Sequence, residues 1–216
     1  MLVKVKLILK SFFNSGHKRT ILAKKNIFIL FGLKAISILI TLILVPLTIR
    51  FVNKNQWGIW LTLSLLIGWI SFFDVGLGND LKNKLAESNA LYEKESSRIY
   101  VSTTYAILIV ISIFLFLTYY AIHYFINWNE VLNTIEISSS ELSVISLMIF
   151  RLLCLQFVLQ TINTILTAFH KVVWVSVINL ISQIGSLIVI LILLKNTENS
   201  LLILVLILAG IPILFN

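Results

Sequence analysis

The sequence has 216 residues, of which 59% are hydrophobic and 12% charged, and its mean hydropathy is +1.01. A soluble domain has about 25% charged residues, which help to cover its surface. The composition therefore excludes a cytosolic enzyme, a secreted disulfide scaffold and a disordered chain, and it predicts that the solvent is the lipid bilayer. The single cysteine, Cys154, excludes an internal disulfide and a cysteine metal cluster.

Five apolar runs are long enough to cross a hydrocarbon core of about 30 Å as helices, which takes about 20 residues each. A sixth run is shorter, and we expect it to be a span cut by the end of the given sequence. We therefore predict an all-α, polytopic membrane helix bundle, with a basic segment at 1–26 and a transmembrane lobe at 27–216. The predicted spans are 27–49, 57–78, 99–128, 144–169, 172–194 and the truncated 201–216.

The basic residues between the spans predict the orientation. The formal net charge is +8, from 17 Lys and Arg against 9 Asp and Glu. Twelve of the 17 fall in segment 1–26 and in the second-to-third and fourth-to-fifth connections, whereas three fall in the connections on the other side. Because cytoplasmic loops carry the excess of Lys and Arg, the N-terminus is expected to be cytoplasmic.

Two features mark the outer side of the third and fourth spans. Tyr119, Tyr120, His123, Tyr124 and Trp128 resemble an aromatic belt at headgroup depth. Further on, a serine at 138 with a glutamate three residues later is typical of a capping box that opens a helix.

Polar side chains gather on one face in three of the predicted helices. At 100° per residue, each set falls within an arc of about 60° to 120°. Such stripes favour a shared hydrated cavity over isolated interhelical hydrogen bonds, since each polar group in a span is costly unless it faces protein or water. The sets are Lys34, Ser37, Thr41 and Thr48 in the first helix; Gln156, Gln160, Asn163, Thr164 and Thr167 in the fourth; and Ser176, Asn179, Ser182, Gln183 and Ser186 in the fifth.

Two cations lie within spans, Lys34 and Arg151. Arg151 sits about 140–180° around its helix from Gln156 and Gln160, so either it or the amide stripe lines the cavity. Lys34 lies at a depth similar to that of Asp74 in the neighbouring helix, so the two could form an ion pair. The alternative is that Asp74 caps the following loop while Lys34 extends its ammonium to the inner surface.

Motifs of catalysis are missing from the sequence. There is no HExxH, no GxSxG, no P-loop and no Cys/His cluster. We therefore expect no enzymatic activity, no cofactor, no metal and no nucleic-acid partner.

The stretch Phe73–Glu87, FDVGLGNDLKNKLAE, resembles a signature of O-antigen and polysaccharide flippases. These belong to the multidrug/oligosaccharidyl-lipid/polysaccharide exporter superfamily. Segments 45–47, 56–60 and 101–105 provide matching context, and the resemblance covers residues 1–215. Asp80 stands where the family usually has glycine. The motif residues are Asp74, Gly76, Gly78, Asn79, Lys82 and Asn83.

The resemblance implies the first six-helix lobe of a two-lobed, MATE-like transporter in the bacterial inner membrane. Its substrate would be an oligosaccharide on undecaprenyl pyrophosphate, flipped from the cytoplasmic to the periplasmic leaflet by alternating access. Implied partners are the lipid-linked oligosaccharide, the bilayer, a polysaccharide polymerase and glycosyltransferases. Alternatives are an ion-coupled multidrug exporter of the same superfamily and an inactive truncated membrane remnant.

The residues themselves favour the flippase branch. A pyrophosphate needs Lys or Arg to offset its charge in a low-dielectric cavity, and amides suit sugar hydroxyls. A cation exporter needs a buried carboxylate instead. The candidate substrate-binding residues are Lys34, Arg151, Gln156, Gln160, Asn163, Asn179 and Gln183.

The predicted topology can be tested by labelling single introduced cysteines with a membrane-impermeant thiol reagent. Because twelve of the fifteen Lys and Arg outside the spans lie on one side, positions 90 and 171 should react only from the cytoplasm. Positions 135 and 197 should react only from outside. The reverse pattern would overturn both the orientation and the direction of transport.

Overall fold

The computed structural model describes residues 18–73, 76–196 and 200–215. Most of this part of the chain is helical, because a helix satisfies its own backbone hydrogen bonds where lipid cannot. Most of the basic segment 1–26 lies outside the described residues. The elements are α2 (Lys18–Val52), α3 (Lys54–Phe73), α4 (Leu77–Ala90), α5 (Lys94–Ile122), the 3₁₀ turn η1 (His123–Phe125), α6 (Trp128–Val131), α7 (Ser139–Leu159), α8 (Thr161–Ala168), α9 (Val172–Asn196), α10 (Leu201–Val205), the π-helical turn η2 (Leu206–Gly210) and α11 (Ile211–Phe215).

Four segments of the described chain are long and apolar enough to cross a membrane. This confirms an all-α membrane protein, and the four correspond to the first, third, fourth and fifth predicted spans. The second predicted span corresponds to α3, and the shortened sixth to α10, η2 and α11. The four segments are Ala23–Val52, Lys94–Phe125, Ser139–Ala168 and Val172–Lys195.

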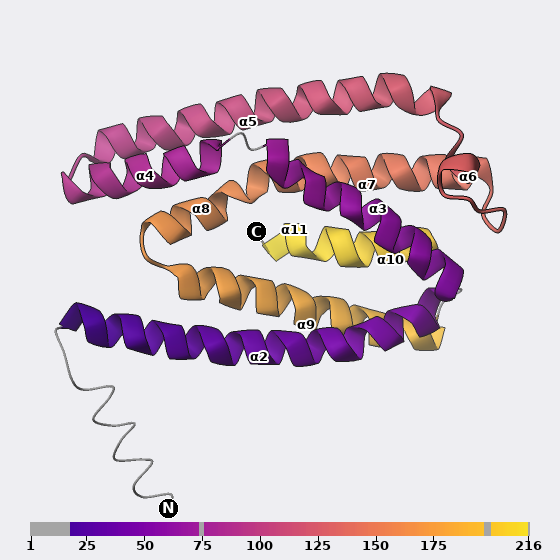
Figure 1. The fold of residues 1–216 in the computed structure, drawn as a ribbon, viewed down its shortest axis with the longest axis horizontal. Helices are drawn as coiled ribbons and strands as arrows, with labels where there is room; N and C mark the ends of the chain where they lie inside the picture. The colour runs from indigo at the N-terminus through magenta and orange to yellow at the C-terminus, as the bar shows by residue number, and fades with distance from the viewer. Residues whose placement is uncertain (1–17, 74–75, 197–199, 216) are drawn as a thin grey trace, which may run out of the picture.

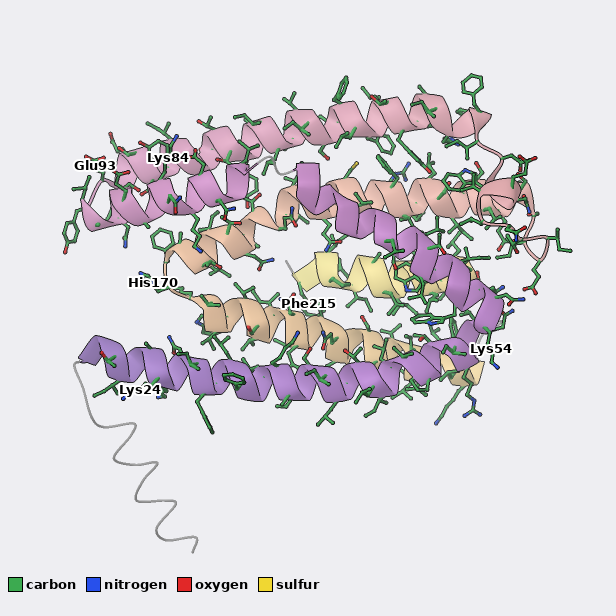
Figure 2. All side chains as sticks on the ribbon, in the orientation of Figure 1. Lys24, Lys54, Lys84, Glu93, His170 and Phe215 are labelled. Carbon is green, nitrogen blue, oxygen red and sulfur yellow. The ribbon has the colours of Figure 1, made fainter. Side chains whose placement is uncertain are left out.

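The long helices lie roughly side by side (Figure 1), with α2 against α9 and α5 against α7. Helix α3 crosses obliquely, and the C-terminal segment α10–α11 lies between α7 and α9. The connections alternate between the two ends of the bundle. Lys24, Glu93 and His170 lie at one end and Lys54 at the other (Figure 2). The two basic connections therefore share an end, as the predicted topology requires.

The main hydrophobic core lies at the Lys54 end. It joins the end of α2 to α3, α7, α9 and α10. Phe51, Leu142, Ile190 and Leu204 are all fully buried there. The bundle is thus tightly packed at this end, and the cavity described below lies further toward the other end along α2 and α9.

Helix α4 differs from the expected cytoplasmic loop between the second and third spans. Leu81 and Leu85 recur at a spacing of four and are buried against Ala168 and its neighbours in α5 and α8. The other side chains of α4 are mostly polar, so the segment is an amphipathic surface helix and is too polar to be a span. Gly76, with φ of 81°, precedes it in a left-handed conformation that suits glycine.

The fourth span begins at Ser139, five residues before the predicted start at 144. Ser138 is its N-cap, and its hydroxyl accepts a hydrogen bond from the Glu141 backbone N–H at 3.3 Å. This confirms the predicted cap. At Gln160 the span is interrupted, and it continues as α8.

The expected aromatic belt is divided between two environments. Tyr120 and Tyr124 are exposed on the helix surface, as a belt requires. His123 and Trp128 are buried instead. The His123 ring Nδ1 lies 3.3 Å from the Ser143 hydroxyl of α7. These two residues therefore anchor the 123–138 connection to the bundle.

Truncating Leu85 should release α4 from α5 and α8. Leu85→Ala removes a buried side chain and should lower the free energy of unfolding by about 2–5 kcal/mol. The loss is measurable as a lower melting temperature in detergent and as faster proteolysis within residues 77–90. Leu91→Ala is the matched control, since Leu91 is 61% exposed. Equal melting temperatures for the two variants would contradict the packing of α4.

Candidate functional site

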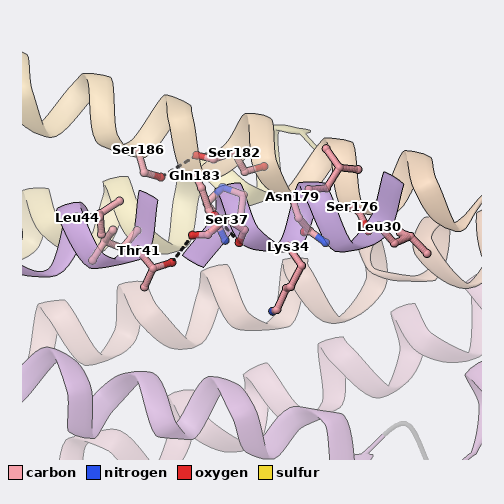
Figure 3. A pocket seen from close by; sticks show the side chains of 13 residues that line it. Leu30, Lys34, Ser37, Thr41, Leu44, Ser176, Asn179, Ser182, Gln183 and Ser186 are labelled. Carbon is pink, nitrogen blue, oxygen red and sulfur yellow. Dashed lines mark hydrogen bonds between the residues drawn. The ribbon is translucent and has the colours of Figure 1, made fainter. Parts of the chain in front are cut away.

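A polar cavity of about 380 Å³ lies between α2 and α9. It brings together most of the first and fifth predicted stripes, which confirms that these two helices share a hydrated space (Figure 3). Thr48 of the first stripe is absent from the lining because it is buried and donates to the carbonyls of its own helix. The cavity is lined by Leu30, Leu33, Lys34, Ser37, Thr41, Leu44, Ser176, Asn179, Ser182, Gln183, Ser186, Leu208 and Pro212.

One hydrogen bond ties the two helices together across the cavity. The Ser37 hydroxyl donates to the Gln183 side-chain carbonyl at 2.8 Å. The other hydroxyls are satisfied within their own helices: Thr41 donates to the Ser37 carbonyl at 2.9 Å, and Ser186 to the Ser182 carbonyl at 3.0 Å. Such hydroxyls keep spare acceptor lone pairs toward the cavity.

Lys34 and Asn179 are the lining side chains with the most unused capacity. Both are exposed, and neither side chain is hydrogen-bonded or ion-paired to another described residue. The Lys34 ammonium points away from the row of α9 side chains (Figure 3). An ammonium contributes three donors, and an amide contributes two donors and an acceptor. The cavity can therefore offer a positive charge and several neutral hydrogen-bonding groups to one ligand.

The C-terminal segment provides the third wall, which the sequence analysis did not predict. Leu208 and Pro212 line the cavity beside α2 and α9. A Cβ at Gly185 would lie 3.4 Å from Ile211 and 3.5 Å from Phe215, so the missing side chain lets α11 pack closely on α9. The signal in the sequence is a small residue on the face next to a polar stripe.

The stripe of the fourth span does not line this cavity, which corrects the expectation of one space shared by three helices. After Gln160 the chain continues as α8, which packs on α4 and brings the stripe to the motif residues. A second pocket of about 270 Å³ includes Gly78, Gln160, Asn163 and Thr164, and a third, of about 260 Å³, is lined by Gly78, Asn79, Lys82, Asn163, Thr164 and Thr167. Gln156 is half-buried and lines neither of these pockets.

The remaining motif residues fall elsewhere. Asn83 is exposed on α4, and Lys84 beside it pairs with Asp80 at 3.1 Å on the helix surface. An exposed pair of this kind contributes little to stability. Asp74 lies outside the described residues, so its pairing with Lys34 stays a prediction.

Arg151 is separate from all three pockets described so far. It lies on the face of α7 next to Phe116 of α5, with its guanidinium carbon 6.0 Å from the ring centroid. The expected choice was that either Arg151 or the amide stripe lines the main cavity. In the structure neither does, and each has its own surroundings.

The arrangement is one of binding groups. Among the described residues, no group of three His, Cys, Asp or Glu is placed to hold a metal ion. No protein-family model, no curated protein and no solved structure matches the chain. The functional argument therefore rests on the geometry of the cavity.

The cavity can be tested by thiol reactivity at two positions of α9. Asn179→Cys should react quickly with a small charged methanethiosulfonate, because a hydrated cavity admits the reagent and allows the thiol to ionise. Ile190→Cys is the control: it lies about 20° from Asn179 around the helix, at 100° per residue, but is fully buried. Similar slow reaction at both positions would show that the cavity is dry or closed.

Proposed function

We propose that this chain forms one lobe of a membrane flippase for oligosaccharides linked to undecaprenyl pyrophosphate. The lobe moves its substrate from the cytoplasmic to the periplasmic leaflet of a bacterial inner membrane by alternating access, and it performs no chemical reaction. The observation that carries the proposal is the α2–α9 cavity, which combines one lysine with neutral hydroxyl and amide groups.

The lining suits the two chemical parts of such a substrate. A pyrophosphate entering a low-dielectric site requires a positive charge and hydrogen-bond donors, which the Lys34 ammonium supplies. The sugar carries many hydroxyls, which pair with neutral amides and serines such as Asn179, Gln183 and Ser176. Neutral partners bind sugars without fixing a second charge in the membrane.

The same lining argues against an exporter of cationic drugs. That activity needs a carboxylate in the cavity to offset the charge of the drug. The 13 residues that line the cavity include no Asp or Glu. A lysine there repels a cation, so the charge at the site favours an anionic substrate.

The packing of the bundle supports alternating access. The core around Phe51, Ile190 and Leu204 seals α2 and α9 beyond the cavity at the Lys54 end. Transport would require this seal to open while the opposite end closes. A volume of about 380 Å³ is small for an oligosaccharide, so the proposal includes a second lobe that completes the cavity, as in transporters built from repeats.

Lys34 provides the direct test of the proposed function. Lys34→Ala should weaken the binding of undecaprenyl pyrophosphate, measured by thermophoresis in nanodiscs, by roughly tenfold or more, the loss of a hydrogen bond to a charged group. It should also abolish delivery of lipid-linked oligosaccharide to the periplasm. Lys34→Arg should keep most of the binding because it keeps the charge.

The control is Lys54→Ala, at the opposite end of the bundle from the two basic connections, which should bind as the parent chain does. Full transport by Lys34→Ala would reject the role of this lysine in the substrate site. In that case Arg151 is the next cation to test.

A further inference from the structure

An apolar groove of about 540 Å³ runs between α5 and α7, on a face that the proposed function does not use. Its walls are aliphatic and aromatic, and Arg151 is the one charged residue in its lining. The groove is lined by Ile109, Ser112, Ile113, Phe116, Leu117, Arg151, Cys154, Leu155 and Val158.

The groove has the shape of a channel for a hydrocarbon chain. On α5 the exposed side chains Ile109, Ile113 and Leu117 recur at every fourth residue, which spans about 12 Å along the helix. On its floor, Ser112 donates to the Cys154 carbonyl at 2.9 Å, and this buried bond holds α5 against α7. The floor therefore carries no unsatisfied hydroxyl, and the walls offer only apolar contact.

Arg151 lies at one end of this channel, beside Phe116, and its side chain is exposed. It forms no ion pair with any described residue, and the lining contains no Asp or Glu. Along the span it is about 18 Å from Ser139 and about 25 Å from Ala168, at 1.5 Å per residue. A permanently charged guanidinium at this depth is costly unless an anion approaches it.

We propose that this groove is a binding site for an anionic phospholipid. The phosphate accepts two parallel hydrogen bonds from the Arg151 guanidinium, and one acyl chain lies along the channel toward Ile109 and Val158. Charge complementarity carries the assignment, because the bilayer is the solvent around these two spans and its anionic lipids supply the counter-ion. The ring of Phe116 holds the guanidinium from the other side.

The direction of the groove fits a lipid in its leaflet. Arg151 is at the end nearer to the 123–138 connection, and the apolar walls continue from it toward the middle of the spans. A phospholipid whose headgroup lies on the side of that connection points its acyl chain the same way. The site is separate from the α2–α9 cavity, so a lipid bound here leaves Lys34 free for the substrate.

The test counts lipids retained by the purified chain in native mass spectrometry, after reconstitution with equal amounts of phosphatidylglycerol and phosphatidylcholine. The parent chain should retain phosphatidylglycerol preferentially. Arg151→Gln should reduce this retention by roughly tenfold, since it removes a charge-assisted pair. Leu155→Trp, which fills the channel but keeps the charge, should reduce it as well, whereas Arg151→Lys should keep part of it.

Arg50→Gln is the matched control, because it removes an exposed arginine at the end of α2, away from the groove. Its retention should equal that of the parent chain, and free glycerol phosphate should not displace the lipid. Undiminished retention by Arg151→Gln or by Leu155→Trp would overturn the proposal. So would a photo-cross-linker at position 155 that attaches to protein instead of lipid, because another chain or segment would then cover the groove.

Discussion

A polar group inside a bilayer must face protein or water, and most of this structure follows from that constraint. The backbone meets it by forming helices. The side chains meet it by gathering on one face, as Lys34, Ser37 and Thr41 do on α2, and by placing that face against a second polar face on α9. The hydrogen bond from Ser37 to Gln183 joins the two faces, while the remaining hydroxyls donate to carbonyls of their own helices. The cavity is thus the space that two polar faces leave when neither can turn toward lipid.

The distribution of packing along the bundle gives this cavity a direction. At the Lys54 end, α2, α3, α9 and α10 form a core with fully buried Phe51, Ile190 and Leu204. Further along the same helices, polar side chains replace that core and the packing opens. A wall that is sealed at one end and hydrated further along can serve alternating access, because only the seal has to change for the opposite side to be reached. Close packing of α11 on α9, permitted by Gly185, makes the third wall part of the same rigid unit.

The sequence predicted the features that depend on one helix alone. Spans follow from the length of apolar runs, the cap at Ser138 from local spacing, and the separate face of Arg151 from its angle to Gln156 and Gln160. Features that depend on which helices meet were not predictable in this way. The amide stripe turned out to face α4, because the chain continues past Gln160 as α8, and nothing local to the stripe specifies its neighbour. Helix α4 was missed because its apolar face of Leu81 and Leu85 is too narrow for a span and was overlooked within a motif expected to form a loop.

The two intramembrane cations differ in what surrounds them, and this difference suits them to different tasks. Lys34 is a compact, strongly hydrated charge among hydroxyls and amides, so water and sugar groups can replace each other around it. A transported headgroup must be bound and then released, which such exchangeable contacts allow. Arg151 presents a planar fork in an apolar groove where no neutral polar side chain besides the engaged Ser112 competes for an anion. A ligand there gains from both the charge pair and the contact of its chain, and has little reason to leave. The chemistry of each cation thus matches its setting: an exchanging site at Lys34, and a retained lipid at Arg151 that stabilises α5 against α7.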